Sequence, residues 1–187
     1  MARLSIAGTL AAAAFATLAG CGSLLEHPGN DALAAFPPLA AVPAPGASPA
    51  ARQYAANLKR GVNFGNMLDA PSEGAWSLRV DDRYIALVGA QGGGMIDSVR
   101  LPVRWSNHAS ADAQARIDPA FMARVDDVVR RLLARGVPVV VDMHHYRQLD
   151  GDPLDAGEAA VPDALVERRF LALWQQIAEH FRDAPPA

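Results

Sequence analysis

The spacing of hydrophobic positions after residue 60 predicts strands that alternate with helices. Short apolar or β-branched runs predict three strands, and each is followed by a stretch in which apolar residues recur at helical spacing. The predicted strands are Gly61–Asn66, Ile96–Leu101 and Val137–Met143. Strands and helices in alternation are typical of βαβ units with a parallel sheet. The pattern therefore predicts an α/β fold with three βα units.

Local signals refine these elements. A helix is expected over residues 81–88, a second from an Asp118 cap to Gly136, and a third from a cap at Asp163 to Phe181. Pro102 cannot donate a ladder hydrogen bond, so the second strand is expected to end there. The third strand is continuously β-branched, which is typical of a strand buried on both faces.

The first 52 residues differ from the rest of the chain. The apolar stretch from Leu4 to Ala19 is shorter than the roughly 20 residues of a membrane-spanning helix. Its end overlaps the segment Leu18-Ala19-Gly20-Cys21, which resembles the lipobox of bacterial lipoproteins. We expect a lipoprotein signal peptide (1–20), a Pro/Ala-rich linker (21–52) and a folded domain (53–187). Cys21 would then be lipidated, with the protein exported across the inner membrane and anchored to the cell envelope. An ordinary leader or a buried thiol is the alternative.

Charge and cysteine content exclude several classes of partner. The 187 residues contain 17 basic and 20 acidic side chains, a net charge of −3, and no basic run that would neutralise phosphates. Nucleic acid is therefore not an expected partner. The single cysteine excludes an internal disulfide and a cysteine-based zinc site.

Polar residues stand where the predicted strands end: Asn66, Arg100, and the pair His144 and His145. The carboxyl ends of parallel strands form one edge, where α/β proteins bind ligands. A structural ion pair at Arg100 and a turn at Asn66 are the simpler explanations for those two residues. The loop at 146–152 is polar and aromatic, as sugar sites tend to be, although a solvated loop would look the same.

A metal site is not expected at this edge. Adjacent histidines on an extended strand point to opposite faces, and two ligands on one face would stand two residues apart. The aspartates Asp142, Asp150 and Asp152 do not form the pattern of a calcium loop. We therefore expect neither a metal nor another cofactor.

Three segments together resemble glycoside hydrolase family 5, the cellulase family of (β/α)8 barrels. They are Arg60–Asp69 with a Gly-x-Asn-x-Gly-Asn strand, Ile96–Trp105 with Arg-Leu-Pro-Val-x-Trp, and Val139–His145 ending in Asp-x-His-His. The resemblance implies that Arg100 supports the catalytic nucleophile and that His144 lines the subsite where the bond is cut. It also places His145, Asn66 and Trp105 near the same pocket. A β-linked polysaccharide is the implied partner.

The resemblance does not extend to the catalytic glutamates. The family carries them after its fourth and seventh strands, the first within Asn-Glu-Pro, and this chain has no such tripeptide. Glu73, Glu158, Glu167 and Glu179 match neither position. A (β/α)8 barrel takes about 250 residues. We therefore expect the first three βα units of a truncated barrel, from a retaining cellulase-like glycosidase that is inactive alone. A non-catalytic carbohydrate-binding or envelope lipoprotein is the alternative.

Overall fold

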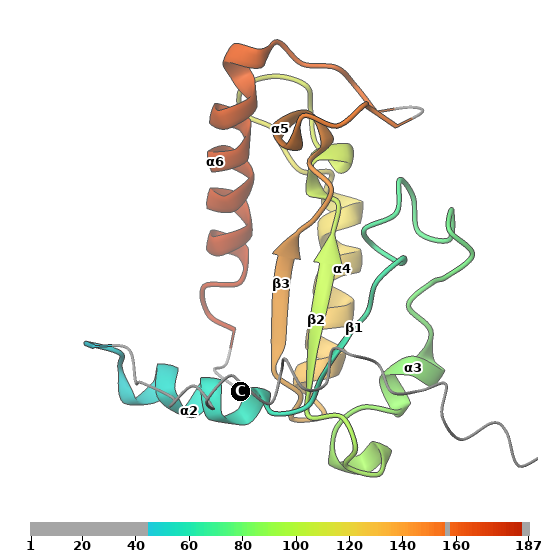
Figure 1. The fold of residues 1–187 in the computed structure, drawn as a ribbon, viewed down its shortest axis with the longest axis vertical. Helices are drawn as coiled ribbons and strands as arrows, with labels where there is room; N and C mark the ends of the chain where they lie inside the picture. The colour runs from blue at the N-terminus through green and yellow to red at the C-terminus, as the bar shows by residue number, and fades with distance from the viewer. Residues whose placement is uncertain (1–44, 156–157, 185–187) are drawn as a thin grey trace, which may run out of the picture. The chain divides into compact units, whose positions relative to one another are not determined.

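The structure, a computed structural model, describes residues 45–155 and 158–184 and contains a parallel sheet in the order β1-β2-β3 (Figure 1). Its strands are β1 (Gly61–Asn63), β2 (Ser98–Val103) and β3 (Val139–Met143). The α-helices are α2 (Pro49–Leu58), α3 (Asp82–Ala86), α4 (Pro119–Leu133), α5 (Arg147–Asp150) and α6 (Asp163–His180), and the 3-10 turns are η1 (Ala90–Gly92) and η2 (Trp105–His108). The predicted α/β fold is confirmed. No helix in the described ranges is both long enough and apolar enough to cross a membrane.

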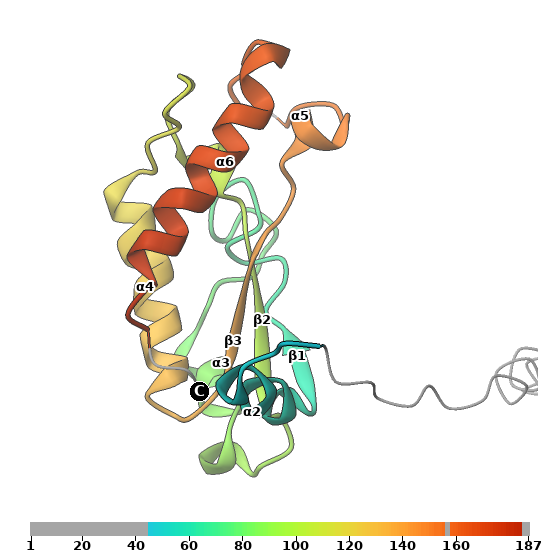
Figure 2. The same ribbon diagram turned by 90° about the vertical axis from the view of Figure 1, so that its left-hand side faces the viewer.

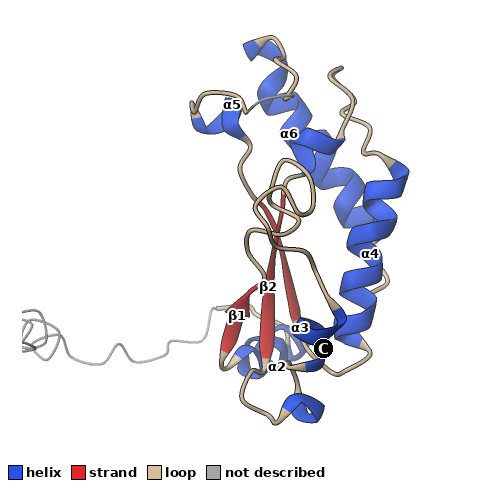
Figure 3. Ribbon diagram, turned by 90° about the vertical axis from the view of Figure 1, so that its right-hand side faces the viewer, coloured by secondary structure: helices blue, strands red, loops and turns tan. Residues whose placement is uncertain are grey.

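The two long helices cover one face of the sheet (Figures 2 and 3). Side chains alternate between the faces of a strand, so every second residue of β2 points toward this layer. Val99, Leu101 and Val103 are fully buried there. The helices meet them with buried apolar residues, which are Val125, Val128, Val129 and Leu132 of α4 and Val166, Leu173 and Ile177 of α6.

The opposite face of the sheet is polar. Asn63 of β1 pairs in register with Arg100 of β2, which pairs in register with Val140 of β3. Paired residues of a parallel ladder lie on the same face, and all three are exposed. This face therefore carries Arg100 in the middle of the sheet.

The structure corrects the ends of the first two strands. β1 ends at Asn63 and not at Asn66. β2 continues through Pro102 to Val103. The backbone carbonyl of Arg100 accepts a hydrogen bond from the N–H of Phe64, so it faces β1. The backbone nitrogen of Pro102, two residues later, faces the same side. At that point β1 has already ended. The missing N–H therefore costs the sheet no hydrogen bond.

The burial predicted for the third strand is wrong. β3 is half-buried, and Val140 is 40% exposed. Among the described residues β3 pairs only with β2, so it is an edge strand. The face that carries Val140 is not packed against other described elements, as it would be if the strand lay inside a larger α/β sheet.

Helix starts were predicted with mixed success. The side chain of Asp118 accepts a bond from the N–H of Ala120 at the start of α4, as expected, and Gly136 takes a left-handed φ of 71° after the helix. The cap predicted at Asp163 is wrong, because Pro162 is the N-cap and no side chain caps α6. The helix predicted over 81–88 is shorter, with Asp81 as the N-cap of α3.

The predicted linker is helical at its end. Ser48 caps α2, and Pro49 occupies its first turn, where a missing N–H costs nothing. The hydroxyl of Tyr54 donates to the carbonyl of Val139, which fastens α2 to the start of β3 (2.8 Å). The signal peptide, Cys21 and the linker up to residue 44 lie outside the described residues.

Candidate functional site at the carboxyl edge of the sheet

The site begins with a close contact after β1. A Cβ built on Gly65 would stand 2.4 Å from Nδ2 of Asn63, so only glycine lets the Asn63 amide lie against this turn. The amide oxygen of Asn63 accepts a bond from Nη1 of Arg100 (2.7 Å). The Gly-x-Asn-x-Gly spacing thus orients the arginine from the neighbouring strand.

Arg100 also joins β2 to β3. Its Nη2 donates to Oδ2 of Asp142 and lies 3.3 Å from Nδ1 of His144. Nδ1 of His144 is 3.1 Å from the same Asp142 oxygen. All three side chains are part-exposed, so the cluster is fixed by charge and hydrogen bonds while it stays open to solvent.

His145 lies beside His144 and not on the opposite face. The backbone of His145 has φ 55°, a left-handed conformation, and the two imidazole centroids are 4.2 Å apart. The premise of an extended backbone at this pair is therefore wrong. Burial is the main cause that lowers the pKa of His145, and the neighbouring His144 lowers it further. The indole of Trp76 packs edge-on against the imidazole of His145, with 5.6 Å between the ring centroids.

A buried carboxylate completes the cluster. Asp69 is 3% exposed, and its Oδ1 accepts the N–H of Met67 (2.8 Å). One carboxylate oxygen of Asp69 and one ring nitrogen from each of His144 and His145 lie within 4.8 Å of one another.

Two arginine networks hold the loops around this edge. Arg104 directly follows β2 and is fully buried, and it binds Asp155 (2.5 Å) and Glu158 (2.9 Å) of the loop before α6. The ion pair with Arg104 lowers the pKa of Asp155. The loop that continues from His145 is thus anchored to the central strand.

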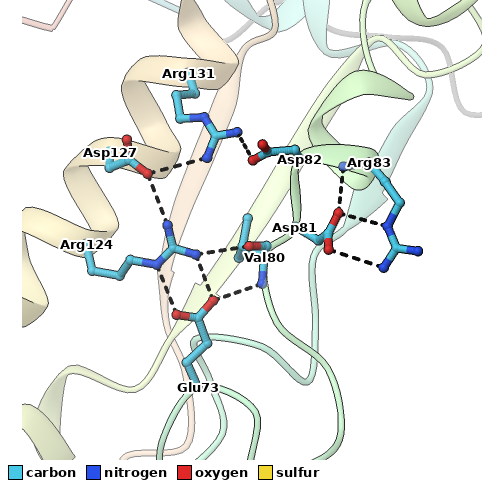
Figure 4. A network of polar contacts seen from close by, with 8 residues as sticks. All are labelled: Glu73, Val80, Asp81, Asp82, Arg83, Arg124, Asp127 and Arg131. Atoms are coloured by element: carbon cyan, nitrogen blue, oxygen red, sulfur yellow. Dashed lines mark hydrogen bonds and ion pairs between the residues drawn. The ribbon is translucent and has the colours of Figure 1, made fainter.

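The loop that carries Trp76 is anchored to α4. Glu73 receives two bonds from Arg124, and one of its oxygens also accepts the N–H of Val80 (Figure 4). The Arg124 hydrogen bond is the main cause that lowers the pKa of Glu73. The network continues through Asp127 and Arg131 to α3. Trp76 therefore projects from a loop that is fixed a few residues to either side.

Two predicted site residues lie apart from this cluster. Asn66 is an exposed turn residue with φ 62°, a conformation that asparagine tolerates. Trp105 is 0% exposed and packs edge-on against Phe121 of α4, so a sugar does not reach its indole in this structure. Trp105, which the resemblance places near the pocket, therefore belongs to the core in this structure.

Sequence reasoning missed four members of the site as binding residues: Asn63, Asp69, Trp76 and Asp142. Asn63 is the register partner of Arg100 on the neighbouring strand. The alternation of side chains between the two faces of a strand could therefore have identified it. Asp142 stands two residues before His144 and could have been assigned to the same face. Nothing local marks Asp69 or Trp76, because loops that follow β1 bring them here.

The glutamates that follow neither catalytic pattern lie outside the cluster. Glu73 and Glu158 bind arginines, and Glu167 and Glu179 are exposed on α6. The carboxylates in the described cluster are therefore those of Asp69 and Asp142.

Comparison with known families decides the classification. The family model for Cellulase (glycosyl hydrolase family 5) matches residues 70–187. The chain belongs to glycosyl hydrolase family 5. Endoglucanase H of Acetivibrio thermocellus is 37% identical over 123 residues, which are 66% of this chain and 12% of that protein. Endoglucanase B of Paenibacillus lautus is 32% identical over 158 residues, 82% of this chain and 26% of that protein.

Solved structures agree with this family 5 assignment. Cel5A of Thermotoga maritima in complex with cellobiose superposes with a TM-score of 0.61 at 38% identity, covering 71% of this chain and 39% of that one. A family 5 endo-β-1,4-glucanase from Bacillus licheniformis with cellotetraose gives 0.57 at 30% identity, covering 69% and 24%. The chain thus has the fold of a partial family 5 barrel, with three βα units, and spans less than half of these relatives.

Proposed function

We propose that this chain forms the β1–β3 part of the sugar-binding site of a retaining glycosidase that hydrolyses β-linked glucan or mannan. The observation that carries the proposal is the open cluster of Arg100, Asp142 and His144 with the Trp76–His145 pair, at the carboxyl edge of a family 5 sheet. Cellobiose, cellotetraose and mannotriose are named with related structures.

The side chains suit an oligosaccharide. A guanidinium and two imidazoles offer hydrogen bonds to hydroxyl groups. The exposed indole of Trp76 offers an aromatic surface for the apolar face of a pyranose ring. In the complete site Arg100 would also hold an ionised carboxylate in place, as it holds Asp142 here.

Hydrolysis requires more than this cluster supplies. Retaining glycosidases use two carboxyl groups about 5 to 5.5 Å apart, one as acid/base and one as nucleophile. Asp142 is bound to Arg100 and Asp69 is buried, and the sequence contains no Asn-Glu-Pro. We therefore propose that the 187 residues bind sugar without cleaving it.

Calorimetric titration of the chain with cellotetraose tests the binding. We expect weak binding that Trp76→Ala and His145→Ala reduce about tenfold, equivalent to 1.4 kcal/mol. The control Leu171→Ala removes an exposed apolar side chain from α6, away from the site, and should leave binding unchanged. Equal affinity in all four proteins would contradict the proposed site.

A reducing-sugar assay on β-glucan tests the absence of catalysis. Release above background, abolished by Asp142→Asn, would show that the chain's own aspartates suffice and would overturn this part of the proposal. Sequencing the gene beyond codon 187 adds an independent check. An Asn-Glu-Pro segment there favours the hydrolase, whereas its absence favours the non-catalytic carbohydrate-binding lipoprotein.

We also propose that Cys21 is lipidated and anchors the protein to the cell envelope. Its position directly after Leu18-Ala19-Gly20 supports this, and acyl chains bind membranes at about 0.8 kcal/mol per buried methylene. Mass spectrometry of the protein from a bacterial host should find an acylated N-terminal Cys21, and Cys21→Ser should release the protein into the soluble fraction. A free thiol or cleavage at another residue would contradict the anchor.

A further inference from the structure

Two histidines and a buried carboxylate converge at the end of β3. Asp69 comes from the loop after β1, whereas His144 and His145 are neighbours in sequence. Their candidate ligand atoms lie within 4.8 Å of one another. This convergence depends on the left-handed backbone of His145, which turns its ring to the side of His144.

Each donor is held by a neighbour. Asp69 is oriented by the N–H of Met67 and is screened from solvent. Nδ1 of His144 is 3.1 Å from Asp142 and 3.3 Å from Nη2 of Arg100. In the tautomer that carries its proton on Nδ1, this N–H donates to the carboxylate and the lone pair is on Nε2. A carboxylate behind a ligating histidine is the usual second layer of a metal site, because it fixes the ring and raises the basicity of the free nitrogen.

The donor set selects the kind of ion. Imidazole nitrogens favour zinc and similar transition metals over calcium or magnesium, which prefer oxygen. Two histidines and one carboxylate also match the three-ligand zinc sites that keep an open position. In tetrahedral geometry, with bonds of about 2.0 to 2.2 Å, ligand atoms lie roughly 3.3 Å apart. The half-buried imidazoles must therefore move inward by about an ångström.

We propose that Asp69, His144 and His145 bind a divalent transition-metal ion of the zinc class, with Asp142 as the positioning residue behind His144. The ion would occupy the surface on which the sugar is proposed to lie. Metal binding itself rests only on these four side chains and not on the proposed sugar binding.

Spectroscopic titration of the full chain with Co²⁺ tests the site, in a Cys21→Ser background that removes the one thiol. We expect visible absorption of low-symmetry Co²⁺ that saturates at one ion per chain and is displaced by Zn²⁺. His145→Gln and Asp69→Asn should each weaken binding at least about tenfold, and Asp142→Asn by roughly tenfold. Circular dichroism of each variant confirms that it is folded.

The control variant is His180→Gln, which removes an imidazole paired with Asp126 at the far end of α6. It should bind Co²⁺ as the parent chain does. Absence of saturable binding in the parent overturns the proposal. Loss of binding in His180→Gln but not in His145→Gln also overturns it, since the ion would then lie elsewhere. If Asp69→Asn is unfolded, the result for His145→Gln decides.

Discussion

Strands β2 and β3 are neighbours of similar apolar content, yet their surroundings differ. On β2, Val99, Leu101 and Val103 are fully buried between the sheet and the long helices. On β3, every described residue keeps some exposure, and Val140 faces solvent. Within the described ranges, β2 has a hydrogen-bonded strand on each side, whereas β3 has one. The comparison shows that position in the sheet, and not β-branched composition, sets how much a strand buries.

The same contrast holds for the residues that follow each strand. Arg104 after β2 is enclosed and binds two acidic side chains, whereas His144 after β3 remains part-exposed in an open cluster. The residue that follows the central strand thus anchors a loop, whereas the residue that follows the edge strand stays accessible. Four pairs of variants test these contrasts, in order of decreasing effect.

Removing the buried guanidinium should have the largest effect. Arg104→Ala leaves Glu158, which is nearly buried, without its cation, and such a loss costs about 3 to 5 kcal/mol of unfolding free energy. His144→Ala, the matched change after β3, should cost less than about 1 kcal/mol. Urea denaturation followed by circular dichroism measures both, and equal losses would break the comparison.

Two valine truncations compare a residue of β2 on the helix-covered face with a residue of β3 on the opposite, exposed face. Val99→Ala removes buried methyl groups from β2 and should cost about 2 kcal/mol. Val140→Ala on β3 should cost at most about 0.5 kcal/mol, because much of its side chain is already in water. Denaturation midpoints for the pair provide the measurement. A loss at Val140 as large as that at Val99 would mean that β3 is covered in solution.

The Glu73–Arg124 pair predicts a smaller, pH-dependent effect. The pKa of Glu73 is lowered in the folded protein, so its contribution is present above the ordinary value of 4.5 and is lost as pH falls below that value. Both side chains are partly exposed, which limits the contribution to about 1 kcal/mol or less. Unfolding free energies between pH 3 and 6 should show that Glu73→Gln is less stable only at the higher pH. The exposed Glu167→Gln on α6 is the control, and a parallel loss there would remove the assignment to Glu73.

The smallest effect on stability is expected from Val140→Lys. A charge on the exposed edge strand should lower self-association with little change in unfolding free energy, about 0.5 kcal/mol or less. Sedimentation velocity measures the association. Val99→Lys, which places the same charge in the core, should prevent folding. Unchanged association in Val140→Lys would show that this strand is not the surface through which copies of the chain meet.

The candidate site could be predicted only in part. Arg100, His144 and His145 were identified because short motifs mark them, and Asp118 was identified as a cap because capping is a local interaction. Trp105 was misplaced because a motif does not state whether its indole points to the core or to the rim. The arrangement of the two histidines was missed because the left-handed φ of His145 places its imidazole on the same side as that of His144.

The sequence by itself determined the alternation of strands and helices, the family, and the motif residues Arg100, His144 and His145 at the carboxyl edge, because these depend on local periodicity and on short motifs. Only the tertiary structure decided which strand is enclosed, which side chains meet, and which arginine is buried. Those outcomes depend on contacts between distant segments, as when Asn63 orients Arg100 and Asp69 comes beside His144. Burial and charge pairing are properties of the assembled surroundings, which no single stretch of the chain encodes.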